Sequence, residues 1–205
     1  MGSFKTEQEE FWTGEFGDKY IERNKNNRLI ASSTKMFSDI FTRCSTIDSV
    51  IEIGANRGNN LIAIKNLLPN ADLSGIEINK NAVESLRKIE NVTAYHSSIL
   101  DIKLEKKAEF VFTRGVLIHI NPDELPSVYE KMYSFSSKYI CVAEYYNPTP
   151  LAIKYRGYEN KLFKRDFAGE LLEKFTDLKL VDYGFLYHRD ALFLNADITW
   201  FLMKK

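Results

Sequence analysis

The sequence predicts an α/β protein with a doubly wound, mostly parallel sheet of seven strands. Short apolar runs alternate with segments of helical periodicity between residues 50 and 143, as in sheets whose parallel strands are joined by helices. The loop from Gly54 to Gly58 joins the first apolar run directly to a helical segment. The last two apolar runs, 178–186 and 198–203, have no helical segment between them, so we expect them to form an antiparallel C-terminal hairpin.

The order of the elements follows from these patterns. We expect strands at residues 50–53, 73–78, 92–95, 109–113, 139–143, 178–186 and 198–203. We expect helices at residues 60–68, 81–89 and 122–136, the third beginning at Asn121-Pro122 with a capping asparagine and a proline in its first turn. We expect one domain, 1–205. Within it, residues 1–45 should form a helical extension that acts as a lid, and residues 46–205 should form the α/β core.

Composition narrows the classes of function. The 205 residues, 44% of them hydrophobic, can bury one sizeable core. The 28 basic and 28 acidic residues give no net charge, so we expect a small-molecule partner and no nucleic acid. Cys44 and Cys141 lie far apart without a Cys-x-x-Cys pattern, which argues against a disulfide framework and bound metal. The polar residues 1–8 and the lack of a membrane-length apolar run favour a cytoplasmic protein that does not enter a membrane. The oligomeric state stays open.

The motif Glu52-x-Gly54-x-x-x-Gly58 predicts a loop that brings bare backbone against a ligand. A side chain at Gly54 would block a nucleoside, and Gly58 would let the next helix begin close to the ligand. A dinucleotide fingerprint would require glycine at Asn56, and the P-loop lysine is absent. Glu52 would repel a phosphate, but it can orient backbone amides or help to hold the amino group of a methionine-like ligand.

A second acidic residue, Glu77, ends the next apolar run, where a carboxylate can accept both hydroxyl groups of a ribose. Together, the two motifs resemble the cofactor site of class I S-adenosylmethionine-dependent methyltransferases, which have a Rossmann-like fold. The resemblance implies S-adenosylmethionine as the cofactor. The contacts that it implies in these two loops are Glu52, Gly54, Ala55, Asn56, Gly58, Glu77 and Ile78.

The resemblance also places residues that follow the third and fourth strands. Ser98 stands where family members present a polar group to the adenine amine, and Ile99 stands where an apolar side chain packs on the ring. Many members have aspartate at the position of Ser98, and Asp101 is an alternative contact. Arg114 and Gly115 would lie near the sulfonium end. From the N-terminal lid, Tyr20 would cover the reacting centre and Arg23 would pair with the methionine carboxylate.

Three residues are candidates for a general base if the acceptor is a hydroxyl: His119, Glu144 and Tyr146. His119 can lose its proton near neutral pH, but it lies in an apolar run and a structural role is the alternative. We expect one shared pocket that contains Tyr20, Arg23, His119, Tyr146 and Arg156.

A closer likeness extends over nearly the whole chain. The segments that carry this likeness to the pseudaminic acid biosynthesis-associated methylases are residues 10–24, 114–148, 155–157, 163–167 and 183–190. This resemblance implies a small-molecule acceptor linked to surface-glycan biosynthesis, such as a nonulosonic sugar intermediate or an amino acid. The expected acceptor contacts are Tyr145, Asn147, Tyr155, Arg156 and His188.

Three other functions remain as alternatives. The first keeps the cofactor but transfers or cyclises its aminocarboxypropyl arm, releasing methylthioadenosine. The second is a non-catalytic nucleoside-binding partner protein, against which the pair Glu52 and Glu77 argues. The third is a nicotinamide-dependent oxidoreductase, against which Asn56 argues.

Overall fold

The computed structural model of the protein describes residues 4–205. The first three of the polar residues 1–8 considered above lie outside this range. The strands are β1 (Ser49–Ile53), β2 (Asp72–Glu77), β3 (Val92–His96), β4 (Ala108–Arg114), β5 (Ser136–Glu144), β6 (Leu151–Tyr155), β7 (Tyr158–Lys164), β8 (Lys179–Leu186) and β9 (Ile198–Lys204). The α-helices are α1 (Glu7–Thr13), α2 (Glu15–Arg23), α3 (Asn27–Phe41), α4 (Asn59–Leu67), α5 (Lys80–Leu86), α6 (Leu125–Phe135) and α7 (Phe167–Lys174). Two 3-10 turns, η1 (Leu117–His119) and η2 (Pro122–Glu124), precede α6.

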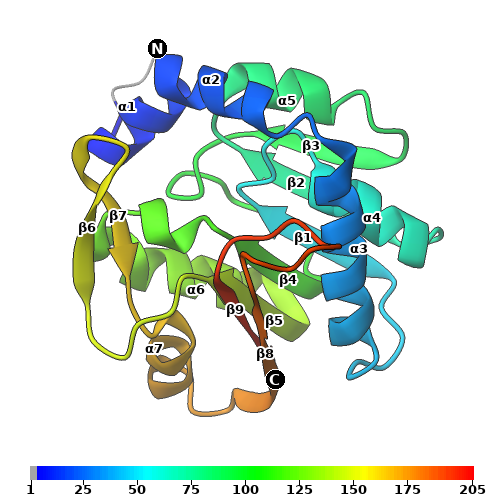
Figure 1. Ribbon diagram of the computed structural model, residues 1–205. Coiled ribbons are helices and arrows are strands. Elements are labelled where there is room, and N and C mark those ends of the chain that lie inside the picture. Colours follow the sequence, from blue (N-terminus) through cyan, green and yellow to red (C-terminus); the bar gives the residue numbers. More distant parts are fainter. Residues whose placement is uncertain (1–3) are drawn as a thin grey trace.

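Seven strands form one sheet in the order β3-β2-β1-β4-β5-β9-β8 (Figure 1). The strands from β1 to β5 are parallel, whereas β9 is antiparallel to both of its neighbours. This arrangement confirms the doubly wound sheet and the C-terminal hairpin, with the predicted strands placed to within three residues. The strand order reverses between β1 and β4, so the ligand site of an open α/β sheet is expected at their carboxyl ends.

Both faces of the sheet are buried, which explains why its strands read as continuous apolar runs. On β4, Phe110 and Phe112 point to the face covered by α3, α4 and α5. Val111, between them, points to the opposite face, where Val128 and Met132 of α6 pack together with residues of α7. Within residues 4–205, no helix combines the length and the apolar composition that a membrane span needs.

The helices α1 and α2 lie across the carboxyl edge of the sheet, at the top of Figure 1. Asn79, which follows β2, donates to the carbonyl of Trp12 at 3.1 Å and to the carboxylate of Asp18 at 3.0 Å. On the other side, Gln8 donates to the carbonyl of Asn160 on β7 at 2.9 Å. These bonds connect α1 to the sheet edge and to the hairpin β6–β7. The third helix of the extension, α3, instead packs against α4 and the sheet and forms part of the core.

The structure differs from the expected fold after β5. Residues 151–164, expected as a loop, form the antiparallel hairpin β6–β7. Its turn consists of Arg156 and Gly157, whose φ angles of +51° and +94° are typical of a two-residue hairpin connection. The helix α7, which begins after the capping residue Asp166, was not predicted either. The expected helix 122–136 begins as the 3-10 turn η2 and continues as α6.

Candidate active site

The loop between β1 and α4 makes a tight turn at the carboxyl edge of the sheet. Gly54 has a φ of +71°, and the N–H groups of Gly54 and Ala55 donate to the carbonyl of Ile76 at 2.8 and 3.0 Å. Gly58, with a φ of +86°, precedes the first residue of α4. Both conformations favour glycine. The loop therefore presents its backbone where the strand order reverses.

Neighbouring side chains give a second reason for these glycines. A Cβ on Gly54 would lie 2.5 Å from Cγ2 of Val116, so a larger residue here would overlap with that side chain. A Cβ on Gly58 would lie 2.3 Å from Ile89 and 2.7 Å from Leu86. Gly58 is not among the residues that line the cavity described below. The glycine at this position therefore lets α4 pack closely on these two side chains.

Substituting Gly54 with alanine should lower the free energy of unfolding by about 2 kcal/mol, because left-handed backbone strain and overpacking each cost about 1 kcal/mol. Urea unfolding of the two single variants Gly54→Ala and Val116→Ala, and of the double variant, would measure this loss. The double variant should be more stable than the sum of the single effects indicates, since Val116→Ala makes room for the new Cβ. Additive effects would show that Val116 does not restrict Gly54.

Glu77, the last residue of β2, connects two loops at the sheet edge. Its Oε2 accepts the N–H of Asn56 at 2.7 Å, and its Oε1 accepts the N–H of Asn79 at 2.7 Å. Burial raises the pKa of Glu77, and the backbone N–H donors act in the opposite direction. Each carboxylate oxygen can accept a second hydrogen bond. Glu77 can therefore still receive the hydroxyl groups of a ribose in the cavity that it lines.

Glu52, on β1, is 1% exposed and has one oxygen available. Asn60 donates to Oε1 at 2.6 Å, and Oε2 has no hydrogen-bond partner within residues 4–205. Burial raises the pKa of Glu52 to about 8. Of the two roles expected from the sequence, orienting the loop amides is not observed, because the loop N–H groups bond elsewhere. Oε2 can accept a donor such as the amino group of a methionine-like ligand.

Arg114, at the end of β4, connects three further segments. Its Nη1 donates to Ser33 of α3 at 2.5 Å and to Asn60 of α4 at 2.8 Å. Its Nη2 donates to Asn195, in the loop between β8 and β9, at 3.0 Å. Burial lowers the pKa of the guanidinium, and the nearby Glu52 opposes this shift. The C-terminal loop is thereby connected to the edge of the sheet.

The turn η1 brings His119 among aromatic rings. Its Nδ1 lies 2.6 Å from the carbonyl of Lys161 on β7. A carbonyl oxygen only accepts, so we assign the proton to Nδ1 and the lone pair to Nε2. Burial lowers the pKa of His119 to about 4, which keeps the ring neutral near pH 7. The ring centroids of Trp12 and Tyr155 lie 4.6 and 4.9 Å from that of His119.

The other two candidate bases lie outside the cavity. The carboxylate of Glu144 accepts the N–H groups of Val116, Leu117 and Ile118 at 3.0, 3.1 and 3.4 Å. Its lone pairs thus hold η1 in place and are turned away from any acceptor. Tyr146 is 42% exposed and does not line the cavity. Neither side chain lines the cavity, and a role of either residue as a general base stays a prediction.

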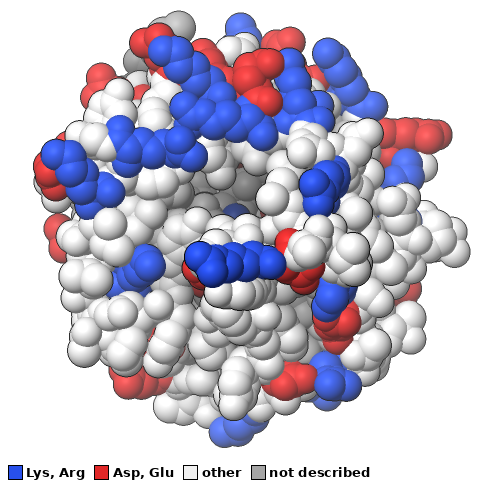
Figure 2. Space-filling view, viewed as in Figure 1, with Lys and Arg blue, Asp and Glu red and all other residues white. Residues whose placement is uncertain are grey.

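A cavity of about 440 Å³ lies between the carboxyl edge of the sheet, α1 and α2, and the β8–β9 loop. Figure 2 shows a hollow near the middle of this face with basic side chains along its upper rim. The predicted site residues that line the cavity are Tyr20, Glu52, Gly54, Ala55, Asn56, Glu77, Ile78, Ser98, Ile99, Arg114, Gly115, His119, Tyr145 and Tyr155. Those that do not line it are Arg23, Gly58, Glu144, Tyr146, Asn147, Arg156 and His188.

Four members of the second group, Arg23, Asn147, Arg156 and His188, have other partners. The side chain of Asn147 donates to the carbonyl of Thr149 at 2.6 Å, and Nδ1 of His188 lies 2.8 Å from Asp197. The guanidinium of Arg23 stacks on the ring of Phe16 at 5.4 Å, and that of Arg156 stacks on Tyr155 at 5.7 Å. The shared pocket therefore contains Tyr20 and His119, as expected, but Arg23, Tyr146 and Arg156 lie outside it.

Buried polar atoms without a partner are concentrated at this cavity. Of the six such side-chain atoms within residues 4–205, five belong to lining residues, namely Gln8, Trp12, Glu52, Asn56 and Arg57. Folded proteins leave few buried polar groups unpaired, so this set indicates a polar ligand. Gly115 adds open space, because a Cβ there would meet no atom within 4 Å. The donors and acceptors together suit a nucleoside that carries an amino acid group.

The sequence interpretation missed several lining residues. Glu9 was not predicted as a site residue. It belongs to the capping box of α1, Thr6-x-x-Glu9, which by itself accounts for an acidic residue at that position. Trp12 was not among the predicted site residues, although it lines the cavity. Asn195 lies in a loop without any motif, and only its bond to Arg114 shows that it belongs to the site.

Comparison with known proteins agrees with this geometry. Residues 50–137 match a protein family described as a methyltransferase domain. No curated protein sequence matches the chain.

Among solved structures, the plantazolicin methyltransferase BpumL with S-adenosylhomocysteine is 15% identical, has a TM-score of 0.70, and aligns over 97% of this chain and 94% of its own. The 1,6-didemethyltoxoflavin-N1-methyltransferase of Burkholderia thailandensis is 12% identical, with a TM-score of 0.70 and coverages of 97% and 86%. The magnesium protoporphyrin IX methyltransferase of Synechocystis PCC 6803 is 11% identical, with a TM-score of 0.69 and coverages of 96% and 97%.

At these identities, the solved structures show a shared fold. The matched methyltransferase domain contributes the activity class, and it includes the glycine loop and Glu77. The unpaired polar atoms at the cavity fit the cofactor that these enzymes use. The matched domain and the shared fold support an S-adenosylmethionine-dependent methyltransferase with a Rossmann-like fold.

Proposed function

We propose that this enzyme methylates an oxygen or nitrogen atom of a small acidic acceptor, such as a nonulosonic sugar intermediate or an amino acid. The observation that carries the proposal is the position of His119. Its ring is neutral, its Nε2 has a free lone pair, and it shares one cavity with Glu77 and the glycine loop. An acceptor beside His119 is therefore within the same enclosed space as the cofactor.

Aromatic rings wall the part of the cavity around His119. Trp12 of α1 contacts Tyr20 of α2 at 5.2 Å between ring centroids, and Tyr155 of β6 completes the wall on the side of the hairpin. Such rings exclude water and pack well against the apolar face of a sugar ring or the side chain of an amino acid. This wall favours a compact acceptor over an extended polymer.

Two cations lie immediately outside this wall and support an acidic acceptor. Phe16 contacts both Trp12 and Tyr155, and the guanidinium of Arg23 stacks on its outer side. Arg156 stacks on Tyr155 in the same way. Both guanidinium groups are exposed and can make two-pronged contacts with a carboxylate.

The proposed roles of the residues follow from this arrangement. When bound, S-adenosylmethionine would supply the methyl group from its sulfonium. The thioether S-adenosylhomocysteine would then leave without help from an acid. Glu77 binds the ribose hydroxyls and Oε2 of Glu52 accepts the amino group. Nε2 of His119 accepts the proton of the acceptor's hydroxyl or amine, while α1 and α2 act as a lid that excludes water. Glu144 positions η1 and thereby His119.

The test is product analysis with purified protein. S-adenosylmethionine would be incubated with nonulosonic sugar intermediates and amino acids, and each acid would be compared with its uncharged amide. We expect S-adenosylhomocysteine and an acceptor that has gained one methyl group, with the acid preferred over its amide. Release of methylthioadenosine would instead indicate aminocarboxypropyl chemistry. Preference for the amide would contradict the proposed acidic acceptor.

Substituting Tyr155 with alanine should raise the KM for the acceptor about tenfold, since a buried aromatic wall contributes about 1 to 2 kcal/mol to binding. The Kd for S-adenosylhomocysteine should stay within about twofold, because Tyr155 lies on the side of His119, away from Glu77. Steady-state kinetics and calorimetry would measure both constants. Tyr183→Ala, on the exposed side of β8, is the matched control. A change in cofactor affinity with unchanged KM would contradict the acceptor role.

A further inference from the structure

We infer that Glu9 of α1 binds the exocyclic amino group of the cofactor's adenine, and that Ser98 positions its carboxylate. The carboxylate at this end of the cavity thus comes from the N-terminal helix and not from the loop after β3. The inference rests on the cofactor and is independent of the acceptor proposed above.

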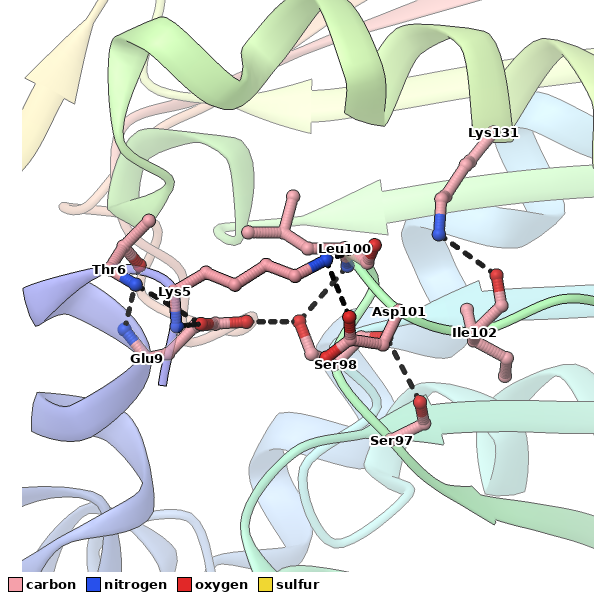
Figure 3. A network of polar contacts seen from close by, with 9 residues as sticks. All are labelled: Lys5, Thr6, Glu9, Ser97, Ser98, Leu100, Asp101, Ile102 and Lys131. Atoms are coloured by element: carbon pink, nitrogen blue, oxygen red, sulfur yellow. Dashed lines mark hydrogen bonds and ion pairs between the residues drawn. The ribbon is translucent and has the colours of Figure 1, made fainter. Parts of the chain in front are cut away.

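The first support for this role is that the carboxylate of Glu9 is held at the wall of the cavity. Its side chain lines the cavity although the residue is only 8% exposed. Oε2 accepts the N–H groups of Lys5 and Thr6 at 2.6 and 3.2 Å, and the hydroxyl of Ser98 donates to Oε1. Figure 3 shows Glu9 reaching from α1 across the gap to Ser98. A carboxylate is thus held at the cavity wall by three donors, with lone pairs remaining for a fourth.

The second support is the position of this carboxylate relative to Glu77. β3 lies beside β2, which ends at Glu77, so the loop after β3 is within reach of the base of a ribose bound at Glu77. There, the cavity is lined by Ile78 and Ile99, whose apolar side chains suit the faces of a planar ring. Ser98 and Glu9 lie beside this apolar section and are the polar groups available to the edge of the ring.

Asp101, the alternative from the sequence, does not occupy this position. Its carboxylate pairs with Nζ of Lys5 at 2.6 Å, its side chain is 58% exposed, and it does not line the cavity. Figure 3 shows that this ion pair lies beside the link between Glu9 and Ser98 and braces the same end of α1. Ser98 itself is too short to replace a carboxylate, and its Oγ already accepts the N–H of Leu100 at 3.0 Å.

The test compares S-adenosylhomocysteine with S-inosylhomocysteine, in which a carbonyl oxygen replaces the amino group of the base. The wild-type protein should bind the adenine compound at least about tenfold more tightly, because a carboxylate opposite a carbonyl oxygen leaves two acceptors facing each other. In Glu9→Gln, the amide can donate to the inosine carbonyl. The preference should therefore fall about tenfold or reverse. Titration calorimetry of the intact protein measures both dissociation constants without any turnover.

The choice of glutamine separates recognition from helix capping, because glutamine also serves in a capping box. Glu10→Gln, on the same helix but exposed, is the matched control and should leave the preference unchanged. Adding Ser98→Asp to Glu9→Gln returns a carboxylate to this site and should restore the preference for adenine. Ser98→Asp alone places two carboxylates together and should weaken binding.

Two results would overturn the inference. If Glu9→Gln kept the wild-type ratio of the two dissociation constants, including the case where both ligands weaken equally, Glu9 would have only a structural role. If the wild-type protein bound neither compound, the cofactor assignment itself would fail, and this inference with it.

Discussion

Replacing His119 with asparagine is expected to lower kcat about 100-fold while the Kd for S-adenosylhomocysteine stays within about twofold. Asparagine can keep a donor close to the position of Nδ1, and so the bond to the carbonyl of Lys161, but it has no counterpart of Nε2. The loss would therefore be confined to the step in which the acceptor gives up its proton. Steady-state kinetics with the identified acceptor, together with calorimetry, would measure it.

His96→Asn is the control for this experiment, because His96, the last residue of β3, is exposed and does not line the cavity. The pH profile gives a second check. Protonation would remove the lone pair of Nε2, but burial lowers the pKa of His119 to about 4. The protonated, inactive form therefore builds up only as the pH falls toward about 4, and kcat should show no step from His119 near pH 6.5. A step near pH 6.5 that disappears in His119→Asn would contradict the assigned environment.

Replacing Glu77 with alanine should weaken binding of S-adenosylhomocysteine by about 3 kcal/mol, or roughly 100-fold in Kd. The substitution removes the acceptors for the ribose hydroxyls and also leaves the N–H groups of Asn56 and Asn79 without their partner. The first effect removes contacts to the ligand, and the second changes the shape of the loops that line the cavity. Calorimetry would measure the affinity, and thermal unfolding would show that the protein remains folded.

Glu84→Ala is the matched control, since Glu84 is an exposed carboxylate on α5 in the adjoining segment. Its affinity for S-adenosylhomocysteine should equal that of the wild type. Full affinity in Glu77→Ala would mean that the ribose is bound elsewhere in the cavity.

The sheet could be predicted because its strands are buried on both faces and therefore form short continuous apolar runs. The hairpin β6–β7 could not be recognised in the same way, because six of its twelve strand residues are exposed and only three, Lys161 to Phe163, are buried. Its one local signal was the turn Arg156-Gly157, which is less distinctive than Asn-Gly. The helix α7 follows directly from this hairpin and was missed with it.

Some residues of the candidate site could likewise be predicted from the sequence, and others could not. Glu52, Glu77 and Arg114 could be placed together because the carboxyl ends of neighbouring parallel strands meet at one edge. Tyr145 and Tyr146 follow β5 consecutively, and successive side chains of extended backbone point to opposite sides. Only the three-dimensional path of the chain decides that Tyr145 lines the cavity and Tyr146 faces solvent. The same holds for side chains on α1, because the docking of a separate helix is not encoded in any local motif.

The single helix α1 contributes to both ends of the cavity. Glu9 and Trp12 are three residues apart, so they lie on neighbouring turns of one face. Glu9 reaches the loop after β3, and Trp12 contacts His119 in the aromatic wall. A ligand that fixes α1 at one end therefore also fixes it at the other. By thermodynamic linkage, a cofactor and an acceptor that both contact this short helix would raise each other's affinity by the same factor.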